Sequence, residues 1–193
     1  MANKKAAVEL SIGTIVIIVL AMSMLILGLV LVRNIFRGAT DSVDEINEGV
    51  KEEIKNLFVR EDDRAVLKLT DGTAKVKQGQ SFGVAFGVRN TEMGSTTSQT
   101  FKYDTILDDP AIRDKCGVSK EVAEDWVNFG SGTLSVNPGK FDAERIKVTI
   151  PEDAPLCETK YRILIYRPDK GETPLNPYED LSFFVQIGSK GLL

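Results

Sequence analysis

The residues that most often carry out enzymatic chemistry are missing from this sequence or are not arranged for it. The 193 residues include no histidine, which removes the commonest general base and the commonest metal ligand. The motifs G-x-S-x-G, H-E-x-x-H and G-x-G-x-x-G and the phosphate-binding P-loop are all missing. Gly130-Ser131-Gly132 has only the form of a loop. We therefore expect no enzymatic activity, no cofactor and no metal centre.

Two pairs of adjacent acids, Asp62-Asp63 and Asp108-Asp109, offer the oxygen ligands that calcium prefers. Neither pair has the spacing of an EF-hand calcium loop, so both are interpreted as solvated loop acids. The net charge of −4 argues against a nucleic-acid-binding surface.

The two cysteines, Cys116 and Cys157, allow either one disulfide or two thiols. Both are expected near loops that can meet at one end of a β-domain. A disulfide that closes roughly 40 residues would stabilise the fold by about 4 kcal/mol and suits an oxidising exterior. We predict the disulfide, which would anchor an insertion over 108–129; two free thiols are the alternative.

The longest apolar stretch of the chain runs from Leu10 to Val32 and contains no Asp, Glu, Lys or Arg. As a helix it would be roughly 35 Å long, enough to cross a lipid bilayer. It has no polar face, unlike a helix on the surface of a soluble protein. The sequence therefore predicts a transmembrane helix with its N-terminus in the cytoplasm.

Small residues recur along this stretch at Thr14, Ala21 and Gly28, every seven residues. They would lie along one face of a helix and let a second helix approach closely. We interpret this face as an assembly surface on which copies of the helix pack together. The alternative is a chance placement of small residues in a helix that faces lipid.

Beyond the apolar stretch, residues 41–58 have the 3-4-4-3 apolar spacing of an amphipathic helix. From residue 65 onward the apolar pattern changes to a period of two, interrupted by turn signals. Seven strands are predicted, at 65–69, 81–88, 100–107, 132–136, 146–150, 160–166 and 181–187. A helix near 119–127 is expected in the insertion. Such a pattern is typical of an antiparallel, immunoglobulin-like β-sandwich.

The N-terminal third resembles archaeal type IV pilin-like proteins, the superfamily of pilins and archaellins. The stretch Lys4-Lys5-Ala6-Ala7-Val8 matches the prepilin-peptidase pattern of two charged residues, a small residue and then apolar residues. Residues 11–16, Ser-Ile-Gly-Thr-Ile-Val, are similar to the start of archaellin helices. The resemblance implies cleavage between Ala6 and Ala7 by a prepilin peptidase; a cut after Lys4 is the alternative.

Many pilins carry a glutamate at the fifth mature position, and Glu9 is third or fifth here, depending on the cut. The resemblance implies that Glu9 pairs with the new α-amino group of a neighbouring subunit during assembly. The alternative is a solvated Glu9 in the lipid headgroup region.

These observations predict an α+β chain with a leader over 1–6, a long hydrophobic and then amphipathic N-terminal helix over 7–58, and a β-sandwich head over 59–193. The resemblance implies a structural subunit of an extracellular type IV pilus-like filament at the cell surface. Its partners would be other copies of itself, the membrane before assembly, and the prepilin peptidase. The alternative is an uncleaved single-span membrane protein with an exterior sandwich, similar to an archaellum stator subunit or a surface anchor.

Overall fold

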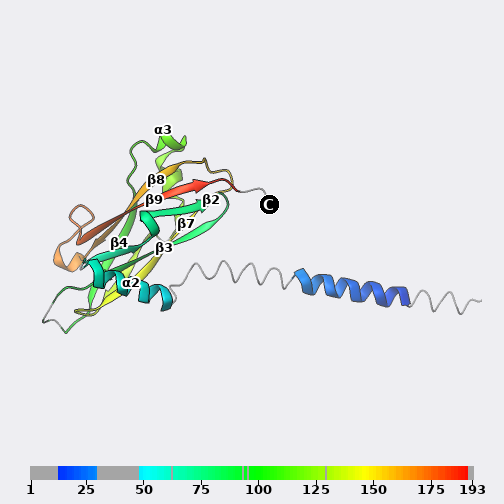
Figure 1. The fold of residues 1–193 in the computed structure, drawn as a ribbon, viewed down its shortest axis with the longest axis horizontal. Helices are drawn as coiled ribbons and strands as arrows, with labels where there is room; N and C mark the ends of the chain where they lie inside the picture. Colours follow the sequence, from blue (N-terminus) through cyan, green and yellow to red (C-terminus); the bar gives the residue numbers. More distant parts are fainter. Residues whose placement is uncertain are drawn as a thin grey trace, which may run out of the picture. The chain divides into compact units, whose positions relative to one another are not determined.

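A computed structural model describes residues 13–29, 48–61, 63–92, 94, 96–128 and 130–190 of the chain. The chain divides into two compact units, Met1–Ser42 and Val43–Leu193 (Figure 1). Within the first unit the described residues, 13–29, are helical throughout.

The predicted fold class is wrong, because the structure describes no long apolar N-terminal helix. The prediction placed an apolar helix over 10–32 and an amphipathic helix over 41–58, either joined as one bent helix or restarted at Ser42. Within this stretch the structure describes helix only at 13–29 and from Glu48 onward. Among the described residues, no helix combines the length and the apolarity needed to cross a membrane. The predicted transmembrane helix, and the localisation as a membrane-inserted precursor, are wrong on the same finding.

The second unit is mostly β and contains, among the described residues, nine strands in two sheets. One sheet has the order β1-β3-β7-β5 and the other the order β2-β9-β8-β4-β6. The strands are β1 (Ala65–Lys68), β2 (Thr73–Lys77), β3 (Ser81–Arg89), β4 (Gln99–Leu107), β5 (Val127–Asn128), β6 (Ser131–Val136), β7 (Phe141–Thr149), β8 (Glu158–Tyr166) and β9 (Glu179–Gly188).

The chain crosses from one sheet to the other between β1 and β2. β1 pairs antiparallel with β3, whereas β2 pairs parallel with β9. Between them lies the short helix η1 (Thr70–Gly72), in which Asp71 and Gly72 have φ angles of 55° and 64°. Left-handed backbone of this kind turns the chain sharply and is tolerated best by glycine and by short polar residues. The parallel pair corrects the expectation of a wholly antiparallel sandwich.

The hydrophobic core lies between the two sheets and is filled by alternate residues of the strands. Its largest fully buried side chains include Phe86 on β3, Phe101 on β4, Tyr161 on β8 and Phe183 on β9. The rings of Tyr161 and Phe183 stack with centroids 5.6 Å apart. Offset aromatic contacts of this kind add to the free energy gained from burial.

Helix α2 (Glu48–Glu61) belongs to the second unit, where it packs on β1, β3 and β7 (Figure 1). Ile54 and Phe58 are its buried residues, in contact with Val66 and Ala85 of the sheet. A Cβ atom at Gly87 on β3 would overlap Ile54 Cγ2 and would lie 2.9 Å from the Phe58 ring. The absence of a side chain at Gly87 therefore lets α2 approach the strand closely.

The insertion between β4 and β6 contains two short helices, α3 (Ile112–Cys116) and α4 (Lys120–Glu124), and then β5. Ser119 is the N-cap of α4, and its hydroxyl accepts a hydrogen bond from Val122 N–H. The helix that the sequence predicts near 119–127 is thus shorter, because α4 ends at Glu124. Trp126 follows it and is 2% exposed. The last helix, η2 (Pro168–Lys170), follows β8.

Candidate functional site

The helix over 13–29 presents apolar side chains around its whole circumference. Twelve large apolar residues of this helix are exposed, from 49% at Ile18 to 77% at Met24. A contiguous apolar surface of this kind is rare on a soluble chain and marks a site of association. The helix is therefore the strongest candidate for a functional surface among the described residues.

The three small residues predicted as an assembly face, Thr14, Ala21 and Gly28, all lie in this helix and are exposed. A spacing of seven residues places them on one slowly drifting strip of the helix surface. A Cβ atom at Gly28 would meet no atom within 4 Å. The strip consequently carries little side-chain bulk that would keep a partner helix away.

The residues of the predicted leader and cleavage site, Lys4, Lys5, Ala6 and Ala7, lie outside the described residues, as does Glu9. Their roles stay predictions.

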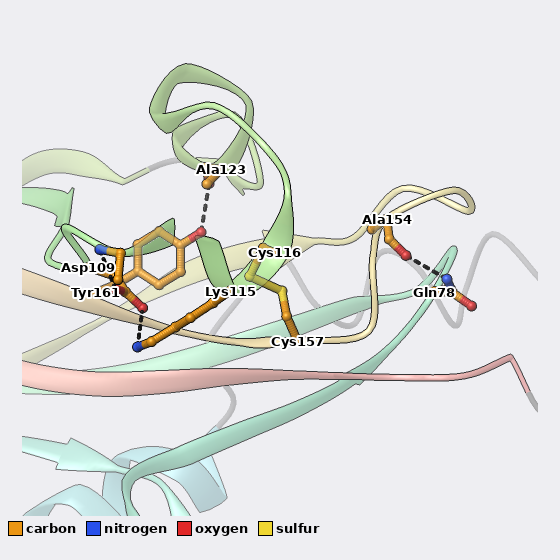
Figure 2. Close-up of a disulfide and its surroundings, with 9 residues drawn as sticks. Gln78, Asp109, Lys115, Cys116, Ala123, Ala154, Cys157 and Tyr161 are labelled. Carbon is orange, nitrogen blue, oxygen red and sulfur yellow. Dashed lines mark hydrogen bonds and ion pairs between the residues drawn. A yellow bond between two sulfur atoms is a disulfide. The ribbon is translucent and has the colours of Figure 1, made fainter. Parts of the chain in front are cut away.

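Cys116 and Cys157, the pair predicted from the sequence, form a disulfide in the structure (Figure 2). Cys116 is the last residue of α3, and Cys157 precedes β8. The bond joins the insertion to the β8–β9 side of the sandwich, because Cys157 O accepts a hydrogen bond from Ile187 N–H. It closes a separation of 41 residues.

Polar contacts hold the same insertion to β8 (Figure 2). Tyr161 OH donates to Ala123 O at 2.6 Å, and burial raises the pKa of the Tyr161 phenol well above its usual range. Within the insertion, Lys115 pairs with the buried Asp109 at 3.0 Å. Asp108, one of the acids considered as a calcium ligand, instead pairs with Lys160 at 2.8 Å, and this hydrogen bond lowers the pKa of Asp108. Asp108 and Asp109 therefore form ion pairs that hold the fold together.

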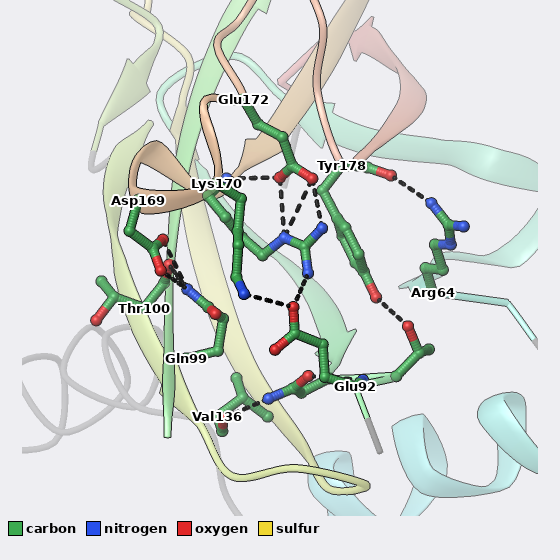
Figure 3. A network of polar contacts seen from close by, with 12 residues as sticks. Arg64, Glu92, Gln99, Thr100, Val136, Asp169, Lys170, Glu172 and Tyr178 are labelled. Carbon is green, nitrogen blue, oxygen red and sulfur yellow. Dashed lines mark hydrogen bonds and ion pairs between the residues drawn. The ribbon is translucent and has the colours of Figure 1, made fainter. Parts of the chain in front are cut away.

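A charged and aromatic cluster at the opposite end of β8 was not predicted from the sequence (Figure 3). Its centre is Arg167, whose guanidinium lies 4.4 Å from the centroid of the Tyr178 ring. Arg167 also pairs with Glu172 and with Glu92, the latter at 3.2 Å. The hydrogen bond to Glu172 raises the pKa of Arg167 and lowers that of Glu172. The Arg64 guanidinium also lies over the Tyr178 ring, 5.1 Å from its centroid.

This cluster joins segments that are far apart in the sequence: the entry to β1, the loop after β3 and the loop between β8 and β9. Its charged groups pair with one another across these segments. Its ion pairs and cation–π contacts hold these loops together. The described part of the chain does not bring together three or more potential metal-ligating side chains.

A groove of about 520 Å³ lies beside α2, where β1 crosses over to β2. Leu57, Leu67 and Phe82 are among its apolar lining, and Lys68 on its rim pairs with Glu53 of α2.

No protein-family model matches the chain, and no curated protein matches it. Solved structures resemble it only distantly. The PapD-like domain 7 of human CEP192 has 12% identity and a TM-score of 0.40, over 67% of this chain and 87% of that one. A CARDB domain from Pyrococcus furiosus, in complex with di-metal ions, has 10% identity and a TM-score of 0.37, over 64% and 84%. A family 123 glycoside hydrolase from Clostridium perfringens has 12% identity and a TM-score of 0.37 over 65% of this chain, which spans only 24% of that hydrolase. TM-scores this low carry no argument about function.

Proposed function

We propose that this chain is a structural subunit of a type IV pilus-like filament, in which the helix over 13–29 packs against the same helix of other copies. The observation that carries the proposal is the exposed apolar surface of this helix, which is apolar on every side. A surface of that kind gains free energy only when other apolar groups cover it.

The size of the gain supports assembly through this helix. Burying one large aliphatic side chain contributes about 1.5–3 kcal/mol, and the helix exposes twelve large apolar side chains. Because they surround the helix, one neighbour covers only part of them, and several neighbours are needed. Thr14, Ala21 and Gly28 would let neighbouring helices approach closely on one side, since the distance between helix axes depends on the side chains at the contact.

The N-terminal residues contribute to the proposal through the resemblance alone. A prepilin peptidase would cut between Ala6 and Ala7 and so remove Lys4 and Lys5 from the end of an apolar helix. Glu9 would then pair with the new α-amino group of a neighbouring copy, because a carboxylate among apolar helices is costly unless it is paired. The mature N-terminus of protein from intact cells is expected at Ala7.

The proposal is tested by electron microscopy of the chain with its N-terminus at Ala7, after it has been transferred from detergent into buffer. We expect filaments from the unaltered chain and none from Leu20→Glu, because a charge at the middle of the helix would have to be buried in an apolar bundle. The matched control is Val59→Glu, which changes an 80% exposed apolar residue on α2. Filaments of Leu20→Glu at the normal yield would overturn the proposal.

A further inference from the structure

Strand β6 forms one edge of the five-stranded sheet, where only β4 pairs with it. Thr105 N–H donates to Gly130 O at 2.6 Å, and this pair continues the β4–β6 register one step beyond Asp104 and Ser131. Hydrogen-bonded and non-bonded pairs alternate along an antiparallel ladder. The N–H and C=O groups of residues 132, 134 and 136 therefore face β4.

The backbone groups of Ser131, Thr133 and Ser135 consequently point away from the sheet. Within the described part of the chain they have no backbone partner. All three residues are exposed, whereas Leu134 and Val136, which alternate with them, are buried in the core. The outer edge of β6 is thus a ladder of donors and acceptors that faces solvent.

The other edges of the two sheets are protected in ways that proteins commonly use against strand addition. β1 has four residues, ends in Lys68 and is in contact with α2. β2 carries Lys75 and Lys77, and β5 has only two residues. β6 has six residues, none of which is charged and none of which is proline.

We propose that β6 pairs antiparallel with β6 of a second copy of this chain, about a two-fold axis at Thr133. In this register Thr133 lies opposite Thr133 of the second copy, and Ser131 lies opposite Ser135. The outward groups of both strands fall at the same residues, so they meet as hydrogen-bonded pairs. The contact joins the two five-stranded sheets into one continuous sheet.

The charge pattern favours a second copy as the occupant of this edge. Self-pairing always places identical residues near one another, and like charges directly opposite each other are destabilising. β6 brings together only serine and threonine, whose hydroxyls form favourable cross-strand pairs. The same self-pairing at β2 would oppose lysines.

The strand is also held firmly in the conformation that pairing requires. Asn90 Nδ2 donates to Val136 O at 3.0 Å at one end of β6 (Figure 3). At Gly132 a Cβ atom would lie 2.6 Å from the hydroxyl of Tyr103, so this ring covers the strand directly. A preordered edge loses little conformational entropy on binding.

The first test is thiol cross-linking of the full chain in dodecyl maltoside micelles, which cover the helix over 13–29. Both native cysteines are in the disulfide, so Thr133→Cys adds the only free thiol. Cα atoms of a hydrogen-bonded antiparallel pair lie about 5.5 Å apart, a separation that a disulfide spans. We expect a covalent dimer from Thr133→Cys and none from the control Lys75→Cys on β2. Equal cross-linking of the two variants, or none from Thr133→Cys, would overturn the proposal.

The second test compares two substitutions by sedimentation in the same micelles. Thr133→Val keeps the backbone N–H and should sediment with twice the protein mass of one chain. Thr133→Pro removes an N–H that faces away from β4, a position that an edge strand tolerates, and should sediment as a single chain. Identical masses for the two variants contradict the pairing. Because micelles mask the helix over 13–29, this result does not depend on whether filaments form.

Discussion

At the scale of single residues, two buried polar side chains differ in whether they are hydrogen-bonded. Asn90 is 1% exposed, and its side chain is hydrogen-bonded at both ends. Its Nδ2 donates to Val136 O, and its Oδ1 accepts from Glu92 N–H at 3.0 Å. Thr159 is also 1% exposed, but its hydroxyl has no hydrogen-bond partner among the described residues. Burying a polar group without a partner costs free energy, whereas a bonded one is compensated.

Substitution of these two residues should therefore affect the free energy of unfolding differently. Asn90→Ala is expected to lower the free energy of unfolding by about 1–3 kcal/mol, because it leaves buried backbone groups unpaired. Thr159→Val, which has nearly the same shape, should leave this free energy unchanged or raise it. Urea unfolding of both variants checks the pair, and a loss of more than about 1 kcal/mol for Thr159→Val would show that the hydroxyl has a partner.

The ion pair of Arg167 and Glu172 predicts how stability depends on pH. The hydrogen bond from Arg167 lowers the pKa of Glu172 from its ordinary value of 4.5 in the folded chain. The pair therefore contributes stability above pH 4.5 that is lost as the pH falls through the lower, folded-state pKa.

Glu172→Gln removes this contribution. We expect the variant to be less stable than the unaltered chain at neutral pH and the difference to shrink as the pH falls below 4.5. Thermal unfolding midpoints measured across this range provide the check. A difference that stays constant with pH would mean that Glu172 acts through packing and not through its charge.

At the scale of elements, the disulfide between Cys116 and Cys157 has the largest expected effect. Closing 41 residues restricts the unfolded chain, and its loss in Cys157→Ala should lower the free energy of unfolding by about 4 kcal/mol in the chain-entropy model. The insertion keeps other anchors, including the hydrogen bond from Tyr161 to Ala123 O. Chemical denaturation should thus show a less stable but still cooperative fold; an unchanged midpoint would contradict the prediction.

Much of the strand pattern could be predicted from the sequence because alternation records which side faces the core. The strands predicted over 81–88 and 100–107 match β3 and β4 to within one residue at each end. β2 was missed because its lysines alternate with only Ala74 and Val76, and β5 because two residues hold no periodic signal. The parallel pairing of β2 with β9 depends on a turn at Asp71, which the sequence shows only as a break.

The candidate sites were predicted unevenly for a related reason. The cysteine pair follows from there being only two cysteines. The Arg167 cluster could not be predicted, because Glu92 lies 75 residues from Arg167 in the sequence. The two become neighbours only through the order of the strands in the sheet. The free edge of β6 likewise depends on which strand ends the sheet.

At the scale of the whole molecule, the chain combines a folded β unit with an apolar helix. The apolar run predicted from the sequence includes the described helix, whose large apolar side chains are exposed. The sequence alone does not distinguish lipid from other apolar helices as the surroundings of such a helix. Leucine and isoleucine gain similarly from lipid and from other apolar helices. Among the described residues no helix could span a membrane, so the predicted membrane span is wrong, while packing between copies remains the proposal.

The central claim is that helices over 13–29 from different copies hold the assembly together. It is tested most directly by a cryo-electron-microscopy reconstruction of the particles that the chain forms in buffer when its N-terminus is Ala7. We predict a filament whose axis is lined by these helices, packed on one another, with the β units outside them. A reconstruction in which the β units alone make the contacts and residues 13–29 face solvent would contradict the account, as would a chain that forms no filament.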